Sequence, residues 1–184
     1  NANGSADLLF NNASGQAYEH VDLLATNDPP NLIKVIDNGL GRRTTVNYVS
    51  VADLMARAEG TGHPWTLTIP FAMQVVADYV VAIAQDLDGI PGSDKQVVQL
   101  GYRDPFYDAD QKQFRGFAFV EKIEHGDEYW GITNGAPGLV TRLAYHVGAP
   151  DGFDNDGNGQ ADQMHGARRE EACLRGSILW TESA

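Results

Sequence analysis

The clearest chemical signal in the sequence is a run of acidic and amide residues toward its C-terminal end. The segment DNDGNGQAD, residues 154–162, places side-chain oxygens at its positions 1, 3, 5 and 9 and a glycine at position 6. Ca²⁺ takes about six to eight oxygen ligands, and alternate residues of a tightly curled loop can supply them. The predicted ligands are the side chains of Asp154, Asp156, Asn158 and Asp162 and the main-chain carbonyl of Gln160.

An EF-hand interpretation of this loop fails at its last ligand. An EF-hand closes with a bidentate glutamate at position 12, where this sequence has His165. A shorter loop survives, because Asp162 can itself close the site. The same spacing recurs without its first ligand at residues 1–7, NANGSAD, ahead of the strand-like Leu8–Phe10. Both segments resemble the calcium loops of FG-GAP/VCBS propeller blades, and the alternative for both is an ordinary solvated turn.

Other candidate sites for catalysis are weaker than this loop. The five histidines have no H-E-x-x-H or H-x-H spacing, which indicates surface or packing residues. No serine lies in a G-x-S-x-G elbow, and the single cysteine, Cys173, is expected to be a small buried residue of a helix. A hydrolase could rest on Asp86 or Asp88, but neighbouring acids on a solvated face explain that pair better. We therefore predict a non-enzymatic protein.

Composition excludes several classes of partner. The 184 residues include 25 acidic and 13 basic side chains, which leaves a net charge of −12. Nucleic acids and anionic membranes both require a basic surface, so neither is an expected ligand. No apolar run reaches the roughly 20 residues that a membrane-spanning helix needs. Since the chain begins at Asn1 without a charged and apolar leader, we expect a mature or excised piece of a longer protein.

The elements that must position the acidic loop are short strands separated by turn residues. Alternating patterns and β-branched runs predict strands at 32–37, 42–49, 74–86, 95–102, 113–123, 139–147 and 177–182. The runs 74–86 and 95–102 could pair as a hairpin. Glycines 39 and 41 are expected to turn the chain from the first of these strands into the second.

Two short helices complete the expected fold. Ser50 can N-cap a helix that runs through Ala58 and ends at Gly60, because apolar residues recur there at helical spacing. The second helix is expected at residues 167–174. The predicted class is therefore all-β, mainly antiparallel, with two short helices.

Several short stretches, taken in order, look like one known family. They are DNGLG with TTVNY at 37–48, IPFAMQVV at 69–76, GY with YD at 101–108, FRGF at 114–117, and LRG with TE at 174–182. Their order and spacing are similar to the middle region of SpvB/TcdB-like proteins, the B components of Tc insecticidal toxins and their relatives with YD (Rhs) repeats. The resemblance extends over nearly the whole chain.

The resemblance implies a structural role. In that family an FG-GAP-like propeller precedes this region and Rhs repeats follow it, and together they build a hollow β-sheet shell around a cytotoxic polypeptide. Residues 1–30 would then end a propeller blade and its linker, and residues 31–184 would form a β-rich domain within a larger spiralling sheet. Within FRGF, Arg115 is expected to pair with an acid, and Gly116 to keep the backbone open for packing.

These inferences combine into one functional prediction. We expect a non-enzymatic shell or scaffold segment of a secreted, extracellular Tc/SpvB-like or YD-repeat protein, stabilised by Ca²⁺. Its expected partners are other segments of the same chain or of an associated toxin chain, and oligomers are compatible with this role. The alternative is a calcium-dependent extracellular adhesion or filament-forming module, since many YD-repeat and FG-GAP proteins are surface polymers.

Overall fold

The structure is a computed structural model that describes residues 7–11, 18–22, 31–83, 95–130, 136–148, 176 and 178–183. Within these ranges the chain forms nine strands, one α-helix and one short 3-10 helix, η1, at Asp127–Trp130. Every strand pairing is antiparallel. The predicted all-β, mainly antiparallel class is confirmed, while the second predicted helix at 167–174 lies outside the described residues.

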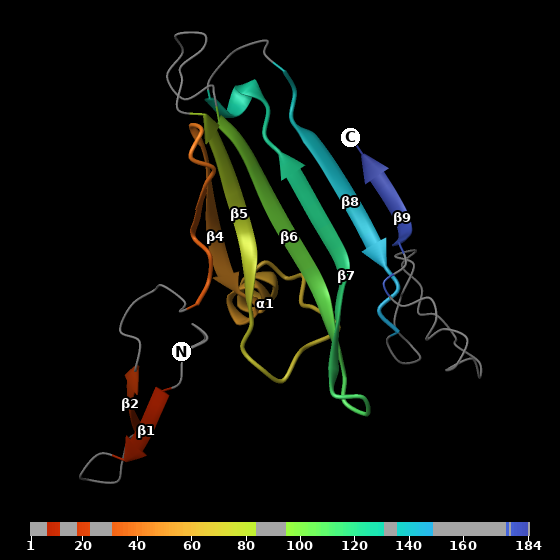
Figure 1. The fold of residues 1–184 in the computed structure, drawn as a ribbon. Coiled ribbons are helices and arrows are strands. Elements are labelled where there is room, and N and C mark those ends of the chain that lie inside the picture. The colour runs from red at the N-terminus through yellow and green to blue at the C-terminus, as the bar shows by residue number, and fades with distance from the viewer. Residues whose placement is uncertain are drawn as a thin grey trace.

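Seven strands form one sheet in the order in which they follow along the chain (Figure 1). They are β3 Val35–Asp37, β4 Arg42–Ser50, β5 Gln74–Ile83, β6 Lys95–Asp108, β7 Gln113–Glu124, β8 Leu139–Tyr145 and β9 Ile178–Ser183. Every inner strand is hydrogen-bonded on both edges, and the predicted hairpin of β5 with β6 is confirmed. Strands β3 and β9 are the outer strands of this up-and-down sheet.

A separate two-stranded sheet lies near the N-terminal end of the chain. Strand β1, Asp7–Asn11, pairs with β2, Tyr18–Asp22, in the register Leu8 with Val21. The predicted strand after Asp7 is therefore confirmed. Both of these sheet faces carry exposed apolar side chains, since Leu8 and Leu9 are 57% and 69% exposed.

Strand β6 is longer than the pattern predicts. The expected strand ends at Tyr102, whereas β6 continues through a buried Pro105 to Asp108. Asp104 has a left-handed backbone, with φ of 54°, and pairing with β7 resumes directly after it, where Pro105 faces Phe117. Proline is disfavoured inside a strand, so only this local change of direction lets the strand continue.

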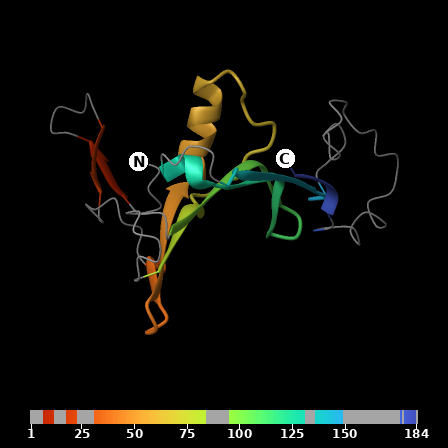
Figure 2. The same cartoon turned by 90° about the horizontal axis from the view of Figure 1, so that it is seen from above.

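Helix α1, Val51–Gly60, follows β4 without a loop and rises from one face of the sheet (Figure 2). The Oγ atom of Ser50 accepts a hydrogen bond from the Ala52 N–H at 3.2 Å, as the N-cap prediction requires. At the other end the Thr61 N–H donates to the Arg57 carbonyl, and Gly62 adopts a φ of 77°. The predicted N-cap is confirmed, whereas the helix continues past Ala58 through Gly60, and Gly62 rather than Gly60 adopts the left-handed conformation that follows it.

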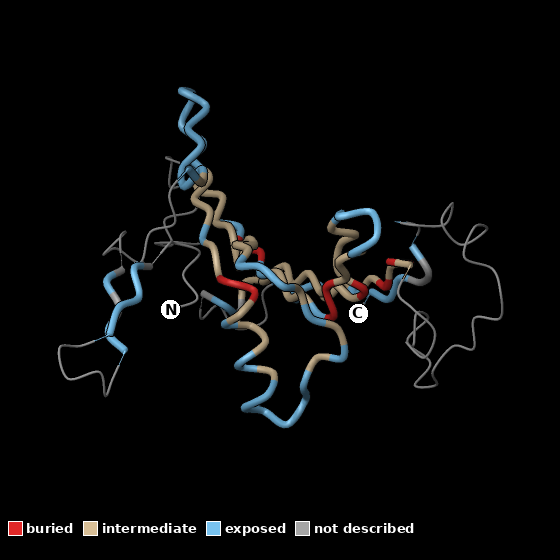
Figure 3. The backbone as a smooth tube through the Cα atoms, turned by 90° about the horizontal axis from the view of Figure 1, so that it is seen from below, coloured by how far each residue is buried: buried red, intermediate tan, exposed pale blue. Residues whose placement is uncertain are grey.

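The buried core of the described residues is small. Figure 3 shows buried positions only in short stretches of the backbone, chiefly in the middle of the sheet. Among the hydrophobic residues described, those classed as buried are Val51, Val97, Val98, Ala118, Ala144 and Val147. A domain normally buries its sheet under a second layer. Here one short helix and the segment after it supply that cover, so much of the sheet surface is only partly buried.

Candidate functional site

A row of charged side chains crosses the sheet on one face. Gly101 in β6 faces Glu121 in β7, which faces Arg142 in β8, which in turn faces Glu182 in β9. Arg142 donates from Nε to Glu121 at 2.8 Å and from Nη1 to Glu182 at 3.4 Å. The hydrogen bond to Glu121, and then the one to Glu182, raises the pKa of the Arg142 guanidinium. This row ties three neighbouring strands into one register.

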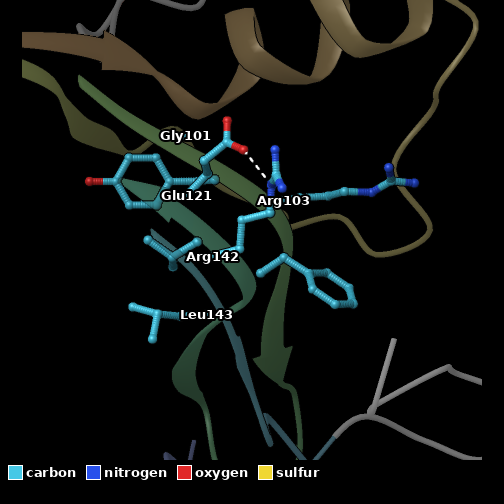
Figure 4. A pocket seen from close by; sticks show the side chains of 8 residues that line it. Gly101, Arg103, Glu121, Arg142 and Leu143 are labelled. Atoms are coloured by element: carbon cyan, nitrogen blue, oxygen red, sulfur yellow. Dashed lines mark hydrogen bonds and ion pairs between the residues drawn. The ribbon is translucent and has the colours of Figure 1, made fainter. Parts of the chain in front are cut away.

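The row borders a hollow of about 440 Å³ between β6, β7 and β8 (Figure 4). Gly101 contributes to its width, because a Cβ atom there would lie 3.6 Å from the Glu121 Cβ. In Figure 4 the side chains of Glu121, Arg142 and Arg103 extend to one side of the sheet, and that of Leu143 extends to the other. The lining offers paired charges and apolar surface, which suits contact with another surface better than a covalent reaction.

Asp104 anchors the segment that follows α1 to the sheet. Its side chain is almost completely buried. Oδ1 accepts hydrogen bonds from the backbone N–H groups of Thr66 at 2.6 Å and Leu67 at 3.1 Å. Oδ2 accepts from Arg103 Nε at 3.0 Å, and Arg103 also reaches the Pro64 carbonyl at 3.5 Å. Asp104 therefore has the donors that a buried carboxylate needs, and it holds the segment after α1 against the sheet.

The FRGF motif forms an ion pair with the end of β6. Arg115 Nη2 lies 3.1 Å from Asp108 Oδ2, and both side chains are nearly buried, at 11% and 15% exposure. Arg115 also hydrogen-bonds Gln111, whose backbone N–H donates to Asp108 Oδ1. The prediction that Arg115 pairs with an acid is therefore confirmed.

Gly116 is required for a different reason from the one predicted. A Cβ atom at this position would meet nothing within 4 Å, so close packing does not explain the glycine. Its φ of 106° does explain it, because residues with a side chain rarely adopt that conformation. The glycine lets β7 change direction beside the ion pair.

Five aromatic rings make a connected cluster at the same end of β6 and β7. Phe71 packs edge-on against Tyr107 and Phe114, with ring centroids 5.3 and 6.3 Å apart. Phe114 packs against Phe117 at 5.6 Å, and Phe117 against Tyr102 at 4.8 Å. Burial raises the pKa of the Tyr102 phenol. Sequence reasoning singled out the two FRGF rings but did not join them to the other three.

One sequence signal could have revealed this cluster, namely that its residues all belong to the stretches that resemble the family. All five rings, together with Arg115 and Asp108, come from the stretches 69–76, 101–108 and 114–117 on which the family resemblance rests. The stretch 69–76 is distant in the sequence from the other two, yet all three converge where the segment after α1 meets the β6–β7 hairpin. The motifs therefore form a packing centre.

Histidines with described side chains lie apart from one another. His146 is 6% exposed, His125 packs at a tilt against Tyr129 with ring centroids 4.4 Å apart, and His63 contacts the Thr61 carbonyl. Surface or packing roles, as predicted, fit all three. In the described part of the chain, no three His, Cys, Asp or Glu side chains are grouped closely enough to hold a metal ion.

The predicted calcium loop cannot be placed against this geometry. Its ligands, Asp154, Asp156, Asn158, Gln160 and Asp162, all lie outside the described residues, as do Asp86, Asp88 and Cys173. The calcium site therefore stays a prediction. Within the described ranges, no helix has the length and apolar character that crossing a membrane requires.

Comparisons with known proteins point to one family. Residues 1–130 match the family described as "Insecticide toxin TcdB middle/N-terminal region". Among solved structures, the chain is similar to the Photorhabdus luminescens Tc holotoxin pore, with 20% identity and a TM-score of 0.66 over 97% of this chain and 9% of that one. It is also similar to a TcdB2-TccC3-Cdc42 structure, with 19% identity and a TM-score of 0.68 over 97% of this chain and 10% of that one.

A third solved structure, TcdB2-TccC3, gives 20% identity and a TM-score of 0.63, again over 97% of this chain and 10% of that one. No curated protein matches the chain. At these identities the structural likeness establishes the fold. The chain spans about a tenth of the length of the solved chains that it resembles.

Proposed function

Because this chain belongs to the insecticide toxin TcdB middle/N-terminal family, we propose that it is a non-enzymatic structural segment of a Tc toxin B component. The observation that carries the proposal is the family match over residues 1–130, supported by a shared fold over 97% of the chain. The segment would form part of the wall of a larger β-sheet shell. That shell would enclose or present a toxin polypeptide.

The geometry of the sheet supports a role as a wall. Its seven strands form a single layer, and among the described residues the outer strands β3 and β9 each have a sheet neighbour on one side only. An outer strand presents unpaired backbone groups to any strand that can pair with it, so further strands could extend the sheet. The charged row links β7, β8 and β9, and the FRGF ion pair links β6 to β7; such cross-strand contacts suit a rigid wall.

The similar solved structures indicate the kind of partner. They describe TcdB2 together with TccC3. We propose that the parent protein of this chain likewise associates with a second toxin chain and that it is secreted. In the same proposal, residues 1–30 end an FG-GAP-like propeller, residues 31–184 form the β-rich domain, and Rhs repeats follow.

Calcium is the proposed cofactor of the loop at residues 154–162. The support is the spacing of Asp154, Asp156, Asn158 and Asp162, with the Gln160 carbonyl between them. Extracellular Ca²⁺ is abundant, which fits a secreted protein. The alternative function, a calcium-dependent adhesion or filament-forming module, would need a surface anchor in the parent chain in place of an associated toxin chain.

Protease protection tests the proposed function. The parent chain would be co-expressed with its candidate partner toxin chain, and the complex would be treated with protease beside each chain alone. We expect the C-terminal part of the partner to survive in the complex and to be degraded when the partner is alone. Equal degradation in both samples, or failure of the two chains to co-purify, would contradict the proposal.

A further inference from the structure

The hairpin of β3 and β4 ends in a turn that its own side chains hold in place. Asp37 Oδ1 accepts a hydrogen bond from the Gly39 N–H at 2.9 Å. Asn38 Oδ1 accepts from the N–H groups of Leu40 at 2.8 Å and Arg42 at 2.9 Å. The Asn38 N–H in turn donates to the Arg42 carbonyl at 3.1 Å. Residues of the hairpin itself therefore supply the hydrogen bonds that hold this turn.

This ordered turn presents a leucine to solvent. Leu40 is 90% exposed, the largest exposure among the large apolar side chains described. It stands between Gly39 and Gly41, whose φ angles of 69° and 95° suit the turn and which place no side chain beside it. Burying a leucine side chain stabilises a protein by roughly 1.5–3 kcal/mol. The hydrogen bonds of this turn hold Leu40 in an exposed position, where it can contact an apolar surface.

The strand leading into the turn carries the same character. Ile33, Val35 and Ile36 are 62%, 50% and 53% exposed. Val35 and Ile36 point to opposite faces of β3, so apolar surface is exposed on both sides of this outer strand. Figure 2 shows the hairpin, in orange, extending away from the helix α1 side of the sheet. An exposed apolar edge of this kind is a recognition surface or an aggregation hazard.

The length of the related chains identifies the occupant of this surface. The similar solved chains are about ten times as long as this one and have the same fold over 97% of it. Most of a parent chain of that size would lie outside these residues and would remain tethered to them at high effective concentration. A segment of the same polypeptide therefore has an advantage over any separate partner in covering β3 and its turn.

We propose that the β3–β4 tip docks into the parent polypeptide itself. Leu40 would insert into an apolar socket formed by a segment outside these 184 residues, and Ile33, Val35 and Ile36 would be covered beside it. The inference rests on the proposed function in one respect only, that this chain is a segment of a longer toxin polypeptide. It does not depend on the partner toxin chain.

Thiol labelling of the intact parent chain tests this inference. A Leu40→Cys variant would be treated with a maleimide, natively and after unfolding in urea, and the modified peptide would be quantified by mass spectrometry. We expect native labelling at least tenfold slower than labelling of the unfolded chain. A Glu59→Cys variant, at the exposed end of α1, calibrates the same measurement at a site for which no docking is proposed.

Three outcomes decide the inference. Slow labelling of the parent chain alone supports the proposed socket, and Leu40→Met should then keep the low deuterium uptake of residues 33–40 that Leu40→Asp loses. Labelling at the rate of the unfolded chain overturns it. Protection that appears only after the partner toxin chain is added also overturns it, because the occupant would then be the partner. The first measurement uses the parent chain alone. A failure of the parent to assemble with the partner toxin chain would therefore contradict the proposed function without affecting this inference.

Discussion

Two regions of this sheet differ in how completely their side chains are packed within the described residues. Where β6 and β7 meet the segment after α1, a buried Asp104 receives three hydrogen bonds and five aromatic rings pack into one cluster. At the edge formed by β3 and its turn, the backbone is equally well ordered, but the apolar side chains face solvent. The first region, the packing centre, stabilises this chain, whereas the second, the outer edge, is prepared for contact with something else.

The largest effect is expected at the anchor of the packing centre. Asp104→Ala would remove an almost completely buried carboxylate and leave two backbone N–H groups and Arg103 Nε without their acceptor; a hydrogen bond to a charged group contributes about 1.5–3 kcal/mol. We expect a loss of about 3 kcal/mol in the free energy of unfolding, measured by urea denaturation. Asp104→Asn keeps one acceptor oxygen and should lose less. Equal stability of wild type and Asp104→Ala would mean that the segment after α1 is not anchored here.

Calcium removal comes next, and it concerns the part of the chain between β8 and the outer strand β9. If the loop binds as proposed, Ca²⁺ at about a hundredfold above its Kd stabilises the folded protein by about 2.7 kcal/mol. Chelation should lower Tm in the wild type but leave Asp156→Ala unchanged. A thermal melt with and without chelator measures this. Identical melts for the wild type in both conditions would reject the calcium site.

Two truncations compare how much the aromatic cluster and the outer edge contribute to the free energy of unfolding. Phe117→Ala removes contacts to both Phe114 and Tyr102 and should cost about 2 kcal/mol, because the ring is only partly buried. Val35→Ala, in the exposed β3, should cost less than about 0.5 kcal/mol in these 184 residues on their own. Urea denaturation of both variants compares the two regions directly. Similar losses would erase the distinction between them.

Substitution of two glycines distinguishes the effect of backbone conformation from the effect of side-chain packing. Gly116→Ala forces a side chain onto a φ of 106° and should destabilise the fold by about 1 kcal/mol. Gly101→Ala is the matched control in the adjacent strand, where a Cβ atom would make an ordinary 3.6 Å contact. Its cost in the same denaturation experiment should be smaller. The reverse ranking would contradict the conformational explanation of Gly116.

The smallest effect concerns pH. Burial raises the pKa of Tyr102 above its ordinary value of 10.0, so the folded chain holds this proton more tightly than the unfolded chain does. The resulting stabilisation is complete below the unfolded pKa and is lost as pH rises through the folded one. As pH rises above about 10, the wild type should therefore lose more stability than Tyr102→Phe. Parallel losses in the two proteins would show that this phenol is not the titrating group.

The elements predicted well from the sequence are those set by local patterns. The strand patterns at 42–49 and 113–123, the Ser50 cap and the glycine turn at 39–41 all depend on neighbouring residues, and the structure confirms them. The pairing of Arg115 with an acid was also predictable, because its partner Asp108 lies only seven residues away.

Contacts between residues that are distant in the sequence could not be predicted from local patterns. The continuation of β6 past Pro105 depends on Asp104. Its Oδ1 atom accepts hydrogen bonds from Thr66 and Leu67, which lie 38 and 37 positions earlier in the chain. Local propensity penalises proline in a strand, and no nearby pattern reports that distant support. The aromatic cluster was missed for the same reason, since Phe71 reaches it only through tertiary packing.

The central claim, that this sheet is one section of a larger wall, is tested most directly by amide hydrogen exchange on the intact parent protein. In the part of the chain that the structure describes, strands β3 and β9 have one neighbouring strand each. We predict that in the parent their backbone amides exchange about as slowly as those of the inner strands β5–β7, because further segments cover them. Rapid exchange of β3 and β9 beside protected inner strands would contradict a continuous wall and leave this sheet as an isolated module.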